Sequence, residues 1–195
     1  MKLLAIFLLL IPLRTGQAAD PLAGIGARIV KTEITEGRFR QEKNLKVLKK
    51  PLISTGTFIY HRSRGVIWQT LTPVSSVLLV NQTRLLTAHD EQALPPAFGR
   101  VFTAMFGGDV QAMKEGFDIS GTNDKTAWKL QLKPKDAWLQ KIIVDMQLTG
   151  GKELQRIDIK EANGNFTRIT FDRITHPETL TPAQEADFER LSSPR

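Results

Sequence analysis

The chain has 195 residues, of which 41% are hydrophobic and 24% charged, with a formal net charge of +7. That length fits one domain, and these fractions are typical of a folded globular protein, not of a disordered or collagen-like chain. The sequence contains no cysteine, which excludes disulfide scaffolds, thiolate metal sites and cysteine nucleophiles.

The N-terminal segment has the layout of a secretory signal peptide. Met1 and Lys2 give a short positive start, an apolar run follows from 3 to 13, and Ala18 and Ala19 form a small-residue cleavage site. The run is too short for a membrane-spanning helix, which needs about 20 residues. We therefore expect a cleaved signal peptide over residues 1–19 and one domain over 20–195. A periplasmic location follows, because secreted eukaryotic domains of this size usually carry disulfides.

The first half of the mature chain predicts a helix followed by an antiparallel sheet. Asp20 and Pro21 are a helix start, and Leu22, Ile25 and Ile29 then share one face. Short alternating runs follow, with polar turns between them, which is typical of hairpins. They cover residues 39–45, 54–60, 66–70, 75–80 and 84–87.

The second half predicts a helix pair, more strands and a last helix. From Pro96 to Met113 apolar residues recur at three and four, which predicts a helix to Gly107–Gly108 and a second one from Asp109. Thr181 and Pro182 begin a C-terminal helix to about residue 191. Strand patterns cover 128–133, 142–149, 154–159 and 166–174. One sheet with helices laid over it is the predicted architecture.

The chemistry of known catalytic motifs is missing from the sequence. It has no G-x-S-x-G, H-E-x-x-H or P-loop pattern, and the three histidines, His61, His89 and His176, lie far apart. His89–Asp90 is typical of an ordinary turn, because no nucleophile or orienting partner accompanies it. We expect no enzyme activity, no metal and no cofactor.

A basic run lies on and after the first predicted strand. It consists of Arg38, Arg40, Lys43, Lys46, Lys49 and Lys50. One interpretation is a surface for an anionic membrane or an acidic partner. The other is the solvated face of a strand whose lysines discourage edge pairing. A nucleic-acid partner conflicts with the signal peptide.

The predicted helix from Pro96 carries large, adaptable apolar side chains. They are Phe98, Phe102, Met105, Phe106 and Met113. Packing of a core against the sheet explains them, and so does a pocket that repacks around an apolar ligand. The pattern leaves both explanations open.

The strand segment also carries a longer pattern. It runs Gly37-x-Phe39-x-Gln41-x-Lys43, then Leu45, Leu48 and Pro51-Leu52-x-Ser54-x-Gly56-x-Phe58, then Arg62, Gly65, Trp68, Thr70 and Pro73. This pattern resembles the LolA-type periplasmic lipoprotein carriers, over about residues 39–174 and most specifically over 56–73. The resemblance implies an α+β fold, a half-open antiparallel β-barrel of about nine to eleven strands with a lid of helices over an apolar cavity.

In that family a carrier takes an acylated cargo from an inner-membrane transporter and passes it to an outer-membrane acceptor. The resemblance therefore implies a monomer that carries an acylated lipoprotein or glycolipid between such partners. It implies a lipid cavity lined by Phe58, Trp68, Leu78, Phe98, Phe102, Met105, Phe106 and Trp128. Arg62 matches the family's arginine that bonds to the lid and holds the empty pocket shut. The alternative is a lipid-sensing regulatory domain of the same fold that acts through protein–protein contact.

Overall fold

The computed structural model describes residues 21–88, 90–93 and 96–193. The helices are α1 (Pro21–Arg28), α2 (Pro96–Gly107), α3 (Val110–Gly116), α4 (Ala137–Gln140) and α5 (Pro182–Ser192). The strands are β1 (Ile34–Asn44), β2 (Leu52–His61), β3 (Gly65–Thr72), β4 (Ser76–Val80), β5 (Arg84–Leu86), β6 (Glu91–Ala93), β7 (Phe117–Asn123), β8 (Trp128–Pro134), β9 (Ile143–Gly150), β10 (Leu154–Glu161) and β11 (Phe166–Thr175). The predicted signal peptide and the proposed helix cap at Asp20 lie outside the described residues.

All eleven strands form one antiparallel sheet in the order β6-β5-β4-β3-β2-β1-β11-β10-β9-β8-β7. Each strand pairs with its neighbour in the sequence, except that β7 follows β6 through the helices and β1 also pairs with β11. The β1–β11 pairing makes the N-terminal and C-terminal halves one continuous sheet. The end strands β6 and β7 do not pair with each other, so the sheet stays open. The predicted fold class, a half-open antiparallel sheet with helices, is confirmed.

Two strands and one helix are additional to the sequence prediction. The strand β6 has only three residues, and β7 contains Asp118, Gly121 and Asn123, which disfavour strands. Tertiary contacts hold β7 in place, because it pairs with β8 along its length and packs under α1 and α3. The helix α4 has four residues and is capped by Asp136, whose carboxylate accepts from Trp138 and Leu139.

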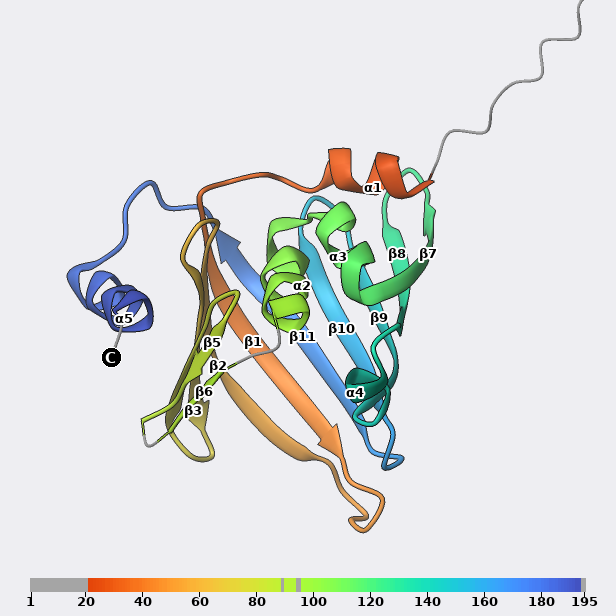
Figure 1. Ribbon diagram of the computed structural model, residues 1–195, viewed down its shortest axis with the longest axis horizontal. Helices are drawn as coiled ribbons and strands as arrows, with labels where there is room; N and C mark the ends of the chain where they lie inside the picture. Colours follow the sequence, from red (N-terminus) through yellow and green to blue (C-terminus); the bar gives the residue numbers. More distant parts are fainter. Residues whose placement is uncertain (1–20, 89, 94–95, 194–195) are drawn as a thin grey trace, which may run out of the picture.

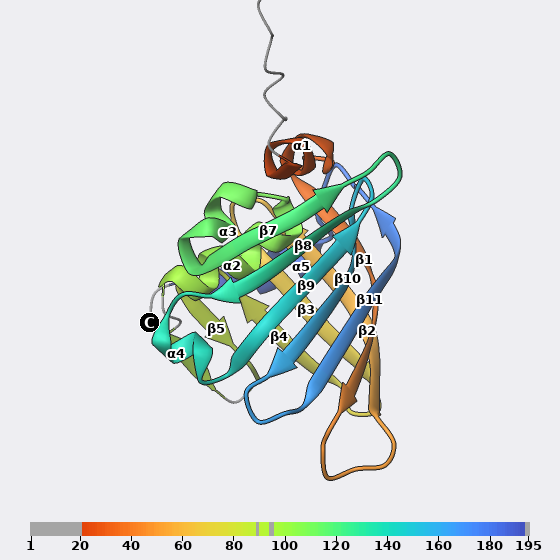
Figure 2. The ribbon, with the colours of Figure 1, turned by 90° about the vertical axis from the view of Figure 1, so that its right-hand side faces the viewer.

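The curved sheet separates two apolar clusters. Figures 1 and 2 show α1, α2 and α3 on its inner side, whereas α5 lies against the outer side. Side chains alternate between these sides, so Phe58 on β2 faces inward and its neighbour Ile59 faces α5. The inner cluster is the larger one and extends from Phe39 to Leu148 across the sheet.

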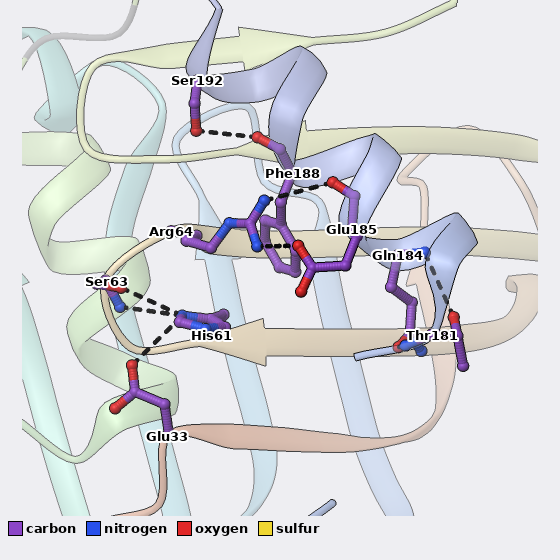
Figure 3. Close-up of polar contacts among 9 residues, drawn as sticks. All are labelled: Glu33, His61, Ser63, Arg64, Thr181, Gln184, Glu185, Phe188 and Ser192. Carbon is purple, nitrogen blue, oxygen red and sulfur yellow. Dashed lines mark hydrogen bonds and ion pairs between the residues drawn. The ribbon is translucent and has the colours of Figure 1, made fainter. Parts of the chain in front are cut away.

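The helix α5 is fixed to the outer side by apolar and polar contacts (Figure 3). Its capping box joins Thr181 and Gln184, which confirms the predicted helix start. Phe188 is fully buried, and the guanidinium of Arg64 lies 4.9 Å from the centre of its ring. Arg64 also donates to the side-chain and backbone oxygens of Glu185.

Over the described residues, the helices are all too short or too polar to cross a membrane.

Candidate functional site

The inner side of the sheet carries a group of aromatic side chains. Phe58 lies opposite Trp68 in the β2–β3 pairing, and Phe39 lies opposite Phe171 in the β1–β11 pairing. The rings of Phe39 and Trp68 stack at a centroid distance of 3.8 Å. Phe171 meets Phe58 edge to face at 5.2 Å. Four strands thus bring their aromatic rings together on one surface.

The helix α2 adds two more rings to this surface. Phe106 lies 5.3 Å from Phe58 and 5.8 Å from Phe171, measured between ring centroids. Phe102, one turn earlier, lies 5.6 Å from Phe106. Both α2 rings are only half-buried and pack against the inner core. The six residues Phe39, Phe58, Trp68, Phe102, Phe106 and Phe171 are called the aromatic cluster below.

The structure has α2 packed directly on the sheet. A cavity of about 20 Å³ remains beside Phe58, Phe106 and Phe171. Only about one water molecule fits into that space. The space beneath α2 is therefore almost completely filled in this state.

Close backbone approach at Gly107 fixes the position of α2 over β2. A Cβ atom on Gly107 would lie 2.3 Å from the hydroxyl oxygen of Tyr60. A Cβ atom on Gly99 would lie 2.1 Å from the backbone oxygen of Gln82, in the turn between β4 and β5. These two close approaches hold α2 at both ends, because only glycine fits at either position. Burial also raises the pKa of Tyr60, while the nearby charge of Arg62 opposes this change.

A second set of contacts closes the mouth of the sheet. The segment between α1 and β1 crosses here, and its Thr32 carbonyl accepts a hydrogen bond from Arg62 at 3.1 Å. The Thr32 hydroxyl lies 3.1 Å from Nδ1 of His176, and Nε2 of His176 lies 2.8 Å from Glu153. Val30 also donates its backbone N–H to the Lys152 carbonyl at 2.8 Å. This group is called the mouth clasp, and it joins the chain after α1 to β2, the β9–β10 turn and the end of β11.

A groove of about 750 Å³ runs outside the clasp, between α1 and the α2–α3 pair. Arg62, Lys31 and Arg100 lie along it, together with the single acid Asp109. Arg100 is paired with Glu115 at 2.9 Å, and Asp109 caps α3 by accepting from Ala112. Several small residues of α1 and α2 line the groove, among them Gly26, Ala27 and Gly107.

The structure brings together part of the predicted lipid-cavity set. Phe58, Trp68, Phe102 and Phe106 belong to the aromatic cluster, and Leu78 lies opposite Trp68 in the β3–β4 pairing. Met105 is buried in the same core. The Phe98 backbone lies in α2, but its side chain is outside the described part of the chain.

Trp128 takes a different position from the other predicted cavity residues. Its ring is 2% exposed, and its indole N–H donates to the Gly151 carbonyl at 2.7 Å. It lies opposite Gly150 in the β8–β9 pairing, in the other half of the sheet from β2 and β3. Its hydrogen bond and burial give it a packing role in this state. The lipid-contact role of the whole set, and the latch role of Arg62, stay predictions.

Sequence reasoning missed three aromatic residues of this site. Phe39 and Phe171 meet only because β1 pairs with β11, and Tyr60 meets α2 only through Gly107. The alternation of β1 places Phe39 on the same side as Gly37, so the sequence could predict that Phe39 points inward. The sequence could not predict that Phe39 lies opposite Phe171, since the two strands are far apart in the sequence.

The histidines and acids of the described residues form no group of three that can hold a metal ion. His176 and Glu153 belong to the mouth clasp, whereas His61 lies beside α5, 3.6 Å from Glu33. His89 falls outside the described residues, and Asp90 and Thr87 bond to each other in the turn around it. The predicted turn at this place leads directly into β6.

Comparison with known proteins agrees with the geometry. A sequence profile of the family described as outer membrane lipoprotein carrier protein LolA matches residues 30–184. The chain belongs to this family. The LolA resemblance inferred from the sequence is confirmed, although no curated protein matches the chain in sequence.

Two of the solved structures that match the chain illustrate the likeness. A LolA superfamily protein from Nitrosomonas europaea matches with a TM-score of 0.50 and 9% identity, over 84% of this chain and 96% of that one. The complex of MucA and MucB from Pseudomonas aeruginosa matches with a TM-score of 0.48 and 12% identity, over 84% of this chain and 58% of that one. At such low identity the first match shows the LolA fold and nothing about the ligand.

Proposed function

We propose that this LolA-family protein is a periplasmic carrier that binds the acyl chains of a lipoprotein or another lipidated cargo. In this proposal it takes the cargo at the inner membrane and delivers it at the outer membrane. The aromatic cluster carries the proposal. It forms the contact between α2 and the inner side of the sheet, and this contact consists almost wholly of aromatic rings. Such an interface offers apolar surface on both sides when the helix moves away.

The energetic argument concerns the acyl chains. Each methylene that leaves water gains about 0.8 kcal/mol, so a diacylated cargo cannot cross the periplasm without cover. In the state described here, Phe102 and Phe106 shield Phe58 and Phe171 from water. Acyl chains that enter beneath α2 replace these ring contacts with apolar contacts of their own. The two states therefore bury similar apolar surface, which keeps the energy difference between them small.

The mouth clasp supplies the polar part of this proposal. The Arg62 side chain donates a hydrogen bond to the carbonyl of Thr32, in the segment after α1. Among the described residues, it makes no hydrogen bond to α2 or α3. We propose that this bond stabilises the empty, closed state, and that loading breaks it. Closure of the emptied carrier then favours release of the cargo. No catalytic step is needed in this cycle.

Two measurements test the carrier function. The protein is purified from the periplasm, and the lipids that remain bound are identified by mass spectrometry. Transfer of a fluorescent diacylated lipopeptide between donor and acceptor vesicles is then followed with and without the protein. We expect a bound acylated species and faster transfer. Lipid binding without any transfer would instead favour the lipid-sensing regulatory domain, and absence of both would exclude the proposal.

A further inference from the structure

The loop between β1 and β2 projects beyond the other strands at the lower end of Figure 1. This loop, residues 45–51, is called the β1–β2 tip together with Leu52, the first residue of β2. Its fold is defined by two hydrogen bonds, from the Leu48 N–H to the Leu45 carbonyl at 2.9 Å and from the Lys46 N–H to Oδ1 of Asn165 at 3.1 Å. The tip is therefore an ordered turn that rests on the β10–β11 turn.

The tip exposes large apolar side chains. Val47 is 87% exposed, Leu52 50% and Leu48 46%. Exposure of three neighbouring aliphatic side chains to water is unfavourable. Clusters of exposed apolar side chains are typical of surfaces that bind a protein or a membrane. The neighbouring β3–β4 turn adds Val74, which is 73% exposed at the same end of the sheet. Packing within the domain explains none of these exposures.

The charge around the tip has one sign. Residues 43–52, which form the tip and the strand end before it, include four lysines and no acid. Lys46, Lys49 and Lys50 are exposed and have no ion pair among the described residues. The nearby acids are already engaged, since Glu161 pairs with Lys43 at 3.3 Å and Glu42 pairs with Arg40. The tip therefore combines aliphatic side chains with uncompensated positive charge.

Two ordinary explanations of these lysines fail. Lysines protect exposed edge strands, but β1 and β2 are interior strands that are paired on both sides. A nucleic-acid surface generally adds aromatic rings on which bases stack, and the tip has none. Aliphatic side chains between lysines are instead typical of surfaces that enter the headgroup region of an anionic bilayer.

We propose that the β1–β2 tip docks this protein onto the surface of an anionic phospholipid bilayer. Val47, Leu48 and Leu52 enter the boundary between headgroups and acyl chains, while Lys46, Lys49 and Lys50 contact the phosphates. The contact is peripheral and reversible. It places the end of the sheet opposite the mouth clasp at a membrane, and it does not depend on what the aromatic cluster binds.

The test is flotation of the full mature chain with vesicles. One set consists of phosphatidylcholine alone, and the other of equal parts of phosphatidylcholine and phosphatidylglycerol. We expect binding to the anionic set only, weakened by added salt. The triple variant Lys46→Gln, Lys49→Gln, Lys50→Gln should bind roughly tenfold or more weakly, because each lysine near such a surface contributes substantially. The double variant Val47→Ser, Leu48→Ser should also bind several-fold more weakly.

A matched control removes the same charge elsewhere. The triple variant Lys125→Gln, Lys129→Gln, Lys133→Gln changes exposed lysines on β8 and in the turn before it, and should bind as the unchanged protein does. Equal loss in this control would overturn the proposal, because overall charge would then explain binding. So would failure of the unchanged protein to bind anionic vesicles, or no effect of the Val47 and Leu48 changes. The assay needs no cargo, so these outcomes leave the carrier function untouched.

Discussion

The hydroxyl of Tyr60 lies against the α-carbon of Gly107, so that a Cβ atom there would approach it to 2.3 Å. Tyr60 is on β2 and is 5% exposed, and Gly107 is the last residue of α2. The ring of Tyr60 also stacks near Phe106 at 6.2 Å. This contact sets how closely the end of α2 approaches the sheet, and therefore how tightly the aromatic cluster is closed.

Replacement of Gly107 by alanine should destabilise the closed state. The added methyl overlaps the Tyr60 hydroxyl, and overpacking of this kind costs about 1–3 kcal/mol, partly offset by the better helix propensity of alanine. We expect urea denaturation to show a lower free energy of unfolding for Gly107→Ala. The double variant Gly107→Ala, Tyr60→Phe removes the overlapping oxygen and should recover part of the loss. A Gly107→Ala protein as stable as the unchanged one would contradict the contact.

A charge on the α2 surface should impair lipid retention more than folding. Phe102 is half-buried in the aromatic cluster, so the carboxylate introduced by Phe102→Glu reaches water in the closed state but must be desolvated by an incoming acyl chain. We expect lipid retention to fall roughly tenfold or more with a small change in melting temperature. The control is Leu180→Glu, at a half-buried residue of the α5 cluster, which should leave lipid retention intact. Parallel losses of stability and retention in Phe102→Glu would assign Phe102 to the core alone.

Loss of the Arg62 side chain should act on release and not on loading. Arg62→Leu removes the bond to the Thr32 carbonyl, which destabilises the closed state by about 1 kcal/mol. Cargo should therefore still load, while hand-off to the acceptor slows a few-fold because closure no longer favours release. The measurement separates acquisition from hand-off. Arg100→Leu removes the same charge from the same groove and should change neither step. Lower acquisition with normal hand-off in Arg62→Leu would reverse the assigned role.

Phe188 should be the main apolar anchor of α5. Its ring is fully buried between α5 and the outer side of the sheet, so Phe188→Ala should lower the free energy of unfolding by about 3–5 kcal/mol. Phe166→Ala is the comparison, because Phe166 is a half-buried residue on β11 that lies against Arg168. Its loss should cost clearly less in the same denaturation experiment. Similar costs for both would show that α5 is only loosely held.

His61 should make the protein less stable as the pH falls below neutral. Burial lowers the pKa of His61, and Glu33 only partly opposes this change. The folded protein therefore prefers the neutral ring. The contribution of His61 to stability is complete above its ordinary pKa of about 6.5 and decreases as the pH falls from there toward the lowered value.

This pH dependence is measured by urea denaturation at neutral pH and at about pH 5.5. His61→Phe keeps an aromatic ring against Phe188, which now meets the His61 ring at 5.7 Å, but has no proton to gain. The stability lost between the two pH values should be smaller in this variant than in the unchanged protein. An identical pH dependence in both proteins would show that protonation of His61 does not oppose folding.

The sequence by itself determined most of the local structure. Turn residues marked the hairpins, Gly107–Gly108 marked the break between α2 and α3, and Thr181 marked the start of α5, each because its backbone or capping chemistry acts over a few residues. Family residues from Gly56 to Pro73 also indicated the LolA fold before any contact was known. These signals are short-range, and they are readable wherever propensity and pattern agree.

Tertiary structure alone decided the closure of the site. The strand β7 has a sequence that disfavours strands and forms because β8, α1 and α3 surround it. The pairing of Phe39 with Phe171, which joins the two halves of the sheet, brings together segments more than a hundred residues apart. No local pattern records which distant strand completes a sheet, because many pairings satisfy the same alternation of side chains. The contact of Thr32 with His176 in the mouth clasp also joins these two distant halves of the chain, and the close approach of Gly107 to Tyr60 joins a helix to a strand more than forty residues earlier.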